Sequence, residues 1–237
     1  LQMTDEVAAF AAYENDEIDL ISVPTAQLGL VPKDPRYADQ VVRNSELVTF
    51  AFQMNTKMPP LDNLKVRQAI ALATDRETFV NDIQQGVGKP AYSWIPVGMP
   101  GHDPDAGREY AFNPERAKQL LAEAGFPDGR GLPEIVFAFA DAAGNKQRAE
   151  WFQAQMKQNL GIDIRLEAME SKAYQAAYTS NQLQLFLAGW GADYPDPDNW
   201  LPDIFGTGRG GNHTQLSDPQ LDDLMARAMA EPDDAKR

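Results

Sequence analysis

The sequence predicts an α/β fold, and one part of the chain carries most of this prediction. Residues 134–140 and 162–169 have the short, apolar and β-branched character of strands, and residues 146–161 between them have the length and spacing of a helix. Because the joints between these segments are short, the two strands should lie parallel, connected by a right-handed crossover. A third strand, expected at residues 183–190, should lie near them.

The remaining elements follow from apolar periodicity and from the residues that begin and end helices. Further strands are expected at residues 18–23 and 46–55. Further helices are expected at residues 4–15, 64–74, 76–86, 113–125, 171–180 and 217–230. The expected capping residues are Thr4, Asp75, Asn113 and either Ser217 or Asp218. Residues 87–112 are rich in proline and glycine, show no regular period and should run over the surface.

Composition narrows the classes of function. The chain has 237 residues, no cysteine and a formal net charge of −14. A negative field of this size opposes binding to nucleic acid and to anionic lipid. The absence of cysteine excludes disulfides, thiolate nucleophiles and zinc sites with cysteine ligands. No stretch reaches the roughly 20 apolar residues of a membrane span. The first residues lack the pattern of a signal peptide, which indicates a processed chain or an excised domain.

The candidate functional site is the segment GWGADYPDPDNW, residues 189–200, which follows the last expected strand. In open α/β sheets, ligands commonly bind outside the carboxyl ends of strands. A calcium loop is not favoured, because Asp196 and Asp198 alternate as ligands would but Trp200 occupies the third ligand position. The two histidines, His102 and His213, lie far apart in the sequence and are interpreted as exposed loop residues.

A catalytic site is not favoured either. Asp193 and Asp196 could form the carboxylate pair of a glycosidase, but both lie in one tight loop, whereas such acids approach a bond from opposite sides. The glycine-rich residues 206–212 lack the lysine and hydroxyl residue of a phosphate-binding loop. The residues alone leave two interpretations open: a carboxylate flanked by aromatic rings that binds an ammonium group, and a solvated turn shaped by Pro195 and Pro197.

Four motifs occur here in the order in which one protein family has them: YENDEIDLISVP, FAFQMNTKMPPLDNLKVRQAIALATDRETFV, AFNPERAKQLLAEAGFP and LAGWGADYPDPDNW. They resemble the extracytoplasmic solute-binding proteins of family 5, the peptide-binding components of ABC importers. The resemblance implies that residues 1–237 form a single lobe of a type II periplasmic-binding-protein fold, with a mixed sheet flanked by helices. The first lobe of the family and the chain's return to that lobe are absent.

The resemblance also implies roles for the candidate segment. In peptide-binding members, the aspartate of the W-x-x-D pattern after this strand binds the terminal ammonium of the ligand, and by match this is Asp193. The residues implied to line the same wall are Trp190, Gly191, Ala192 and Tyr194. The matched positions to which we assign structural roles are Arg67, Asp75, Asp196, Asp198 and Asn199.

The function implied is that of a non-enzymatic receptor. It captures short peptides with a free amino terminus in a cleft between two lobes and delivers them to the permease subunits of an ABC importer. We expect a monomer, periplasmic or lipid-anchored at the cell surface, with no metal and no cofactor. The alternatives are the same fold binding an oligosaccharide, a nickel complex or another small solute and, more distantly, a glycoside-processing enzyme.

Overall fold

The computed structural model describes residues 5–233 and residue 236. The chain divides into two compact units. Unit 1 comprises Leu1–Ser45 and Glu77–Pro90, and unit 2 comprises Glu46–Arg76 and Ala91–Arg237. The expectation that residues 1–237 form a single lobe stays a prediction.

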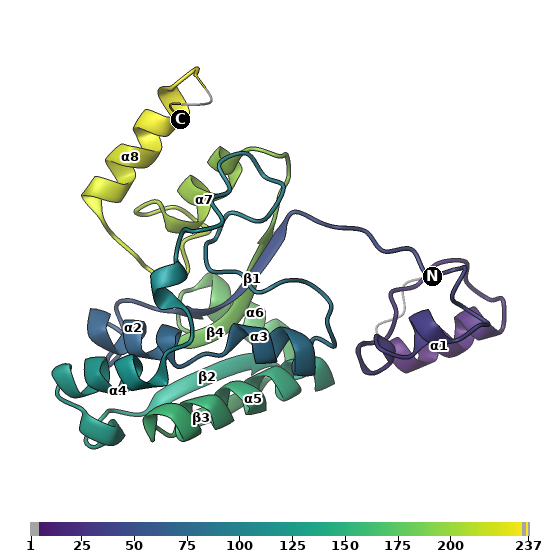
Figure 1. Ribbon diagram of the computed structural model, residues 1–237, viewed down its shortest axis with the longest axis horizontal. Coiled ribbons are helices and arrows are strands. Elements are labelled where there is room, and N and C mark those ends of the chain that lie inside the picture. Colours follow the sequence, from purple (N-terminus) through teal and green to yellow (C-terminus); the bar gives the residue numbers. More distant parts are fainter. Residues whose placement is uncertain (1–4, 234–235, 237) are drawn as a thin grey trace. The chain divides into compact units, whose positions relative to one another are not determined.

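Unit 2 is built on a four-stranded mixed sheet (Figure 1). Its strands are β1 (Val48–Met54), β2 (Ile135–Ala140), β3 (Ile164–Met169) and β4 (Leu185–Gly191). They lie in the order β1-β4-β2-β3, and β2 is parallel to both β3 and β4, whereas β1 is antiparallel to β4. The parallel β-α-β unit predicted from residues 134–169 is therefore confirmed, and so is the mixed character of the sheet.

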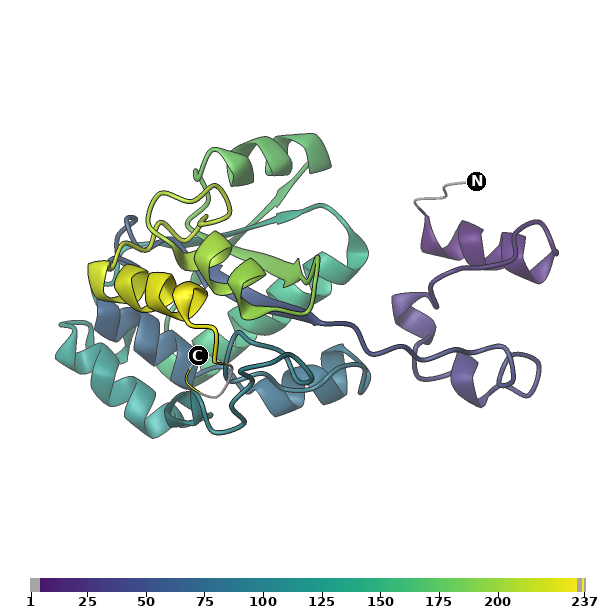
Figure 2. The ribbon, with the colours of Figure 1, turned by 90° about the horizontal axis from the view of Figure 1, so that it is seen from above.

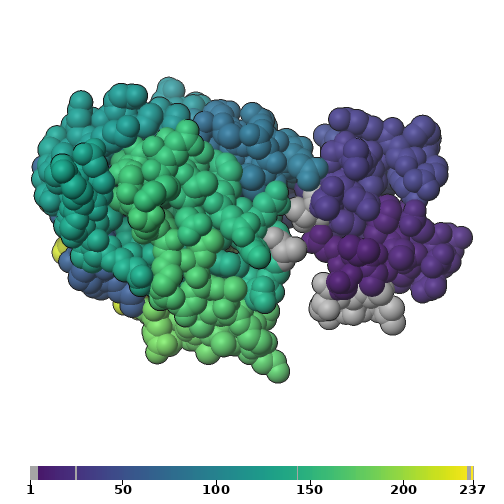
Figure 3. Space-filling view, turned by 90° about the horizontal axis from the view of Figure 1, so that it is seen from below, coloured from purple at the N-terminus to yellow at the C-terminus, as the bar shows by residue number. Residues whose placement is uncertain are grey.

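Helices cover both faces of this sheet, and the alternation of side chains along β2 shows how. Phe137 and Phe139 belong to the main core, whereas Ala138 belongs to a smaller cluster on the opposite face. The main core is closed by α2 (Leu64–Leu72), α4 (Pro114–Glu123) and α5 (Ala143–Leu160), and the smaller cluster by α6 (Ser171–Thr179). Figure 3 shows the outer surface over α4, in teal, and α5, in green.

The capping residues explain where the helices of unit 2 begin and end. The side chain of Asn113 accepts a hydrogen bond from the Arg116 N–H (2.9 Å) at the start of α4, and Pro114 occupies the first position. Gly125 follows the end of α4 with a φ of 96°, a left-handed conformation that glycine adopts without strain. Asp218 caps the last helix, α8 (Pro219–Ala230), which settles the choice between Ser217 and Asp218.

Unit 1 contains short helices joined by irregular chain. Its first helix, α1 (Glu6–Glu14), appears in purple in Figure 2. Asp5 caps this helix by accepting a hydrogen bond from the Ala8 N–H (2.8 Å); the expected cap, Thr4, lies outside the described residues. The helix expected at residues 76–86 is divided into an α-helical turn, α3 (Arg76–Thr78), and a π-helical turn, η3 (Phe79–Ile83).

The prediction of a strand at residues 18–23 is wrong. These residues have no strand conformation, and no strand is recorded in the described part of unit 1 to pair with them. A β-strand needs a neighbour that satisfies its backbone groups, and a β-branched composition does not supply one. Leu20 in this segment is 88% exposed, so the segment also lacks the apolar cover that its composition predicts.

None of the helices formed by the described residues combines the length and the apolar composition that crossing a membrane requires.

The main core generates a stability prediction. Leu121 on α4 is fully buried among the residues that close the sheet, and Leu121→Ala should lower the free energy of unfolding by about 2–5 kcal/mol, because it removes apolar contacts and leaves a cavity. Urea denaturation measures this change. The matched control is Leu224→Ala on α8, where the side chain is 57% exposed and the expected change is within about 0.5 kcal/mol. Equal losses from the two substitutions would contradict this account of the core.

Candidate functional site

The candidate segment leaves β4 at a place where one edge of this strand is paired and the other is open. The antiparallel ladder with β1 extends over all seven residues of β4. Just beyond it, the Ala192 N–H donates to the carbonyl of Leu47 (2.9 Å), which makes these two residues a hydrogen-bonded pair. Bonded and non-bonded pairs alternate along an antiparallel ladder, so the N–H and C=O groups of Gly189 and Gly191 point away from β1.

The opposite edge of β4 is covered only at its beginning. β2 pairs with the first two residues of β4. The carbonyl of Leu187 then accepts a hydrogen bond from the hydroxyl of Tyr174 on α6 (3.2 Å). Beyond it, the outward backbone groups of Gly189 and Gly191 have no partner in the described part of the chain. We call these backbone groups of Gly189 and Gly191 the open edge of β4.

The glycine at position 189 is required by a close approach. Phe50 of β1 lies opposite Gly189 in the ladder, and its ring packs directly on the backbone of β4. A Cβ atom at position 189 would stand 2.4 Å from a carbon of this ring, which would force the ring to move. Phe50 is 68% exposed, so the open edge has a solvent-facing aromatic ring on the neighbouring strand.

Asn199 connects the end of β4 to the turn that follows it. Its Oδ1 accepts hydrogen bonds from the Asp193 N–H (2.9 Å) and from the indole N–H of Trp190 (3.4 Å). Its Nδ2 donates to Oδ2 of Asp193 (3.0 Å). Asn199 is only 4% exposed, whereas Asp193 is exposed and has no cationic partner among the described residues. A buried neutral amide thus holds an exposed, unpaired carboxylate.

The other two acids of the segment are bonded within the turn. Oδ1 of Asp196 accepts a hydrogen bond from the Asp198 N–H (3.0 Å) and caps a short 3₁₀ turn, η6 (Pro197–Asn199). Asp198 accepts a hydrogen bond from the hydroxyl of Tyr194, and this bond raises the pKa of the Tyr194 hydroxyl above its ordinary value. Asp196 and Asp198 therefore have the structural roles that the sequence predicts.

The predicted site residues come from one short stretch and have different environments. Gly191, Asp193 and Tyr194 are exposed, whereas Trp190 and Ala192 are half-buried. The N–H of Ala192 is used in the ladder with Leu47, and the hydroxyl of Tyr194 is used by Asp198, so Asp193 is the member with a free charged group. The assignment of these five residues to ligand binding stays a prediction.

Sequence reasoning missed the residues that support this stretch. Trp200 is fully buried, and its indole N–H donates to the carbonyl of Trp94 (2.7 Å). The rings of Trp94 and Trp200 lie 6.4 Å apart, and Trp94 also contacts Phe205 on α7 (Leu201–Phe205), a short helix that was not predicted. No local pattern distinguishes a buried indole from one that lines a site, so only the fold separates Trp200 from Trp190.

The other candidate groups have structural partners. Nδ1 of His102 is bonded to the carbonyl of Ile95 (2.8 Å), and Nδ1 of His213 to the side chain of Asn181 (2.8 Å). Both histidines are half-buried, and burial lowers the pKa of His213. The expectation that they are exposed loop residues is therefore wrong.

The glycine-rich loop at residues 206–212 is held by one buried side chain. Asn212 donates hydrogen bonds to the carbonyls of Phe205, Gly206 and Leu216. No group of three acidic or histidine side chains within the described ranges is arranged to hold a metal ion.

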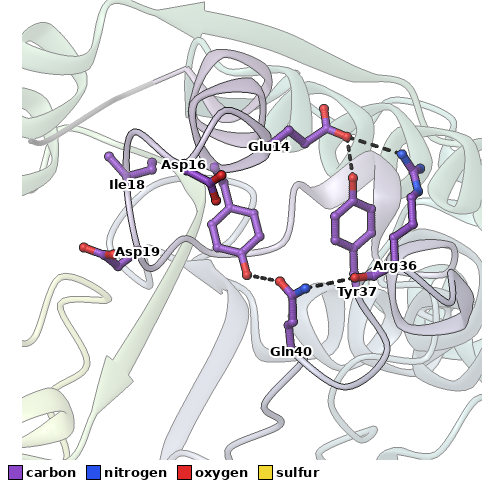
Figure 4. A pocket seen from close by; sticks show the side chains of 8 residues that line it. Glu14, Asp16, Ile18, Asp19, Arg36, Tyr37 and Gln40 are labelled. Atoms are coloured by element: carbon purple, nitrogen blue, oxygen red, sulfur yellow. Dashed lines mark hydrogen bonds and ion pairs between the residues drawn. The ribbon is translucent and has the colours of Figure 1, made fainter.

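Unit 1 contains a separate hollow of about 530 Å³ (Figure 4). Several of its polar side chains are bonded to one another: Tyr13 to Gln40, Tyr37 to Glu14, and Arg36 to Glu14 (3.8 Å). Arg36 also pairs with Asp34 (2.7 Å). The arginine therefore already has two carboxylate partners. These mutual contacts explain how the loops of unit 1 are held. Asp16 and Asp19 also line the hollow, and neither forms an ion pair with a described residue.

The bond between Tyr194 and Asp198 is open to a direct test. Asp198→Asn removes the negative charge that favours the neutral phenol, so the pKa of Tyr194 should fall toward its ordinary value of 10.0. Nuclear magnetic resonance titration with ring-labelled tyrosine measures this pKa. Asp203→Asn is the matched control and should change the pKa less, because the bonded Asp198 is the largest influence and Asp203 a weak one. An unchanged pKa in Asp198→Asn would exclude the bond.

Solved structures and sequences that resemble the chain agree with this fold. The chain is 25% identical to the structure of Burkholderia pseudomallei OppA, with a TM-score of 0.86. The match covers 99% of this chain and 47% of that one. It is 29% identical to "Heme-binding protein A" of Haemophilus influenzae and 28% identical to "Oligopeptide-binding protein OppA" of Bacillus subtilis. These matches cover 95% and 98% of this chain, but 41% and 43% of the relatives.

The chain therefore spans less than half the length of the relatives that it matches, and its fold is part of one lobe of a type II periplasmic binding protein. The family model described as "Bacterial extracellular solute-binding proteins, family 5 Middle" matches residues 1–212. The chain belongs to the bacterial extracellular solute-binding proteins of family 5.

Proposed function

We propose that this chain forms one wall of the ligand cleft in the substrate-binding component of an ABC importer, and that the ligand is a short peptide with a free amino terminus. One observation carries the proposal: an exposed, unpaired carboxylate, Asp193, follows directly on the open edge of β4. Free backbone groups for the peptide bonds lie on β4, and a charged group for the amino terminus lies two residues beyond the end of this strand.

The chemistry of a peptide fits this arrangement. An extended peptide can add to an open strand edge through main-chain hydrogen bonds, which recognise any sequence. At Asp193, the terminal ammonium would make charge-assisted hydrogen bonds. The ring of Trp190, whose orientation is fixed by its bond to Asn199, and the ring of Tyr194 would add cation–π attraction of about 0.5–2 kcal/mol.

The remaining parts of the proposal concern the whole protein. Because the chain spans less than half of its relatives, the opposite wall of the cleft belongs to a second lobe. Closure of the two lobes would bury the peptide, and the closed receptor would deliver it to the permease subunits. The family is described as extracellular and several relatives are named periplasmic, which supports a location in the periplasm or at the cell surface. In this proposal the receptor is a monomer without catalytic activity, and a lipid anchor is one way to hold it at the surface.

The other ligand classes are less well supported. One relative is named a heme-binding protein, but heme carries two carboxylates, which the unpaired Asp193 would repel. An oligosaccharide or a nickel complex would not need a free carboxylate beside an open strand edge. A glycosidase would need a second acid beside Asp193, and the candidate for it, Asp196, is engaged in capping the turn.

Substitution of Asp193 tests the site. In the full-length protein that carries this chain, Asp193→Ala should weaken binding of a free-amine peptide by about 30- to 5,000-fold, because losing one partner of a buried charge pair costs about 2–5 kcal/mol. Isothermal titration calorimetry measures the dissociation constants. An N-acetylated peptide should bind the parent weakly and should lose little more in Asp193→Ala.

The matched control is Asp196→Asn, which removes a charge from the same turn but keeps an oxygen for the cap. It should change affinity by no more than a few-fold. Equal losses from Asp193→Ala and Asp196→Asn would indicate collapse of the turn or a shared cation. Equal affinity of the parent for free and acetylated peptides would exclude the ammonium-binding role.

The chain by itself should bind peptides poorly. One wall leaves half of the ligand in solvent, where the ion pair is screened and the backbone hydrogen bonds compete with water. We expect a dissociation constant no tighter than about 1 mM, about −4 kcal/mol. Calorimetric titration of residues 1–237 with a mixture of tripeptides measures it, and micromolar affinity would show that the second lobe is not needed.

A further inference from the structure

We infer that Asn199 is a positioning residue, which fixes the carboxylate of Asp193 in the direction that receives an ammonium group. This inference rests on the proposed function of Asp193 and adds a residue to which the sequence assigns only a structural role in the turn. It is based on the geometry of three hydrogen bonds around one buried side chain.

The first step is that Asn199 holds both the backbone and the side chain of Asp193. The Asp193 N–H donates to Oδ1 of Asn199, and Nδ2 of Asn199 donates to Oδ2 of Asp193. These two bonds close a ring between the two residues and restrict both the backbone and the χ angles of Asp193. An exposed aspartate without such a clamp would populate several rotamers and would lose that freedom when the ligand binds.

The second step is that the clamp itself is held from the protein interior. Asn199 is buried, and its Oδ1 also accepts the indole N–H of Trp190, which belongs to β4. The next residue, Trp200, is fully buried and bonded to the carbonyl of Trp94. Asn199 is therefore attached on one side to the sheet and on the other to a packed aromatic cluster, so the carboxylate is positioned against rigid elements rather than against a free loop.

The third step concerns charge. An arginine or lysine in this place would also orient Asp193, but it would neutralise the charge that the ammonium has to meet. The amide of Asn199 is neutral, so it fixes Oδ2 and leaves the negative charge in place. No described residue donates a hydrogen bond to Oδ1 of Asp193, and the residue is exposed, so this oxygen is available to a ligand.

The experiment compares Asn199→Ala with a matched variant, Asn212→Ala, in the full-length protein. Asn212 is also a buried asparagine that holds a turn through several hydrogen bonds, but it lies in the loop at residues 206–212. Both substitutions should lower the melting temperature. Only Asn199→Ala should reduce the ratio of affinities for a free-amine peptide and its N-acetylated form, by about 2- to 12-fold, the loss expected when one side chain has to be ordered on binding.

The background of Asp193→Ala separates this inference from the proposed function. In that background, adding Asn199→Ala should leave affinity for the free-amine peptide within about two-fold, because its effect passes through Asp193. If Asp193→Ala alone does not change the affinity ratio, the proposed function and this inference both fail. If Asp193→Ala reduces the ratio but Asn199→Ala leaves it unchanged, or reduces both affinities equally, only the positioning role is overturned.

A second measurement does not depend on the folding of Asn199→Ala. In the unliganded parent, nuclear magnetic resonance couplings should show a single χ1 rotamer of Asp193, and the side-chain amide protons of Asn199 should exchange slowly with water. In Asp193→Ala, one of these two protons should exchange faster, because its acceptor is lost. Averaged couplings for Asp193 in the parent would overturn the inference.

Discussion

The candidate site depends on the place where β2 stops pairing with β4, which is after the first two residues of β4. A strand with both edges paired offers no backbone groups to a ligand, and a strand with neither edge paired is not rigid. β4 has its full length paired with β1 and only its first two residues paired with β2, so it is held firmly and still has an open edge. The glycines at this edge have no side chains that would keep another backbone at a distance.

The side of the sheet where the strands diverge is closed by α6 and by one tyrosine. The last residue of β4 that pairs with β2 is Phe186, and the hydroxyl of Tyr174 satisfies the carbonyl of the next residue, Leu187, which would otherwise be the first unpaired group of this edge. Burial raises the pKa of Tyr174 to about 12, so the hydroxyl keeps the proton that it donates throughout the physiological range. This single hydrogen bond marks where the ordinary sheet stops and the open edge begins.

Much of the fold could be predicted because its signals are local. The helix α4 has its cap, its first-turn proline and its terminal glycine in sequence order, and the parallel pair of β2 and β3 follows from two short joints around one helix. The segment at residues 18–23 shows the limit of this reasoning, because its composition is that of a strand but pairing depends on a partner elsewhere. The antiparallel pairing of β1 with β4 joins residues more than 130 positions apart, and no local pattern indicates it.

The candidate site could also be predicted only in part, where its signals are local. Asp193 could be found because it belongs to a recognisable motif after a strand. Asn199 could not be identified as its partner, since asparagine is ordinary in turns and nothing in the sequence shows that this one is buried and aimed back at the strand. The open edge of β4 was equally hidden, because it depends on where a neighbouring strand ends.

The same hydrogen bonds also explain why only one of three nearby acids is available to a ligand. Each of the three carboxylates has one oxygen engaged, Asp196 by a backbone N–H, Asp198 by a phenol and Asp193 by an amide. Asp196 and Asp198 are half-buried in the turn, whereas Asp193 is exposed. All three donors are neutral, so no charge in this stretch is cancelled. The result is a local negative field concentrated beside a strand edge that accepts any peptide backbone. Such a surface attracts the end of a peptide that carries an ammonium and repels the end that carries a carboxylate, so electrostatics would set the direction of the chain while the strand edge leaves its sequence free.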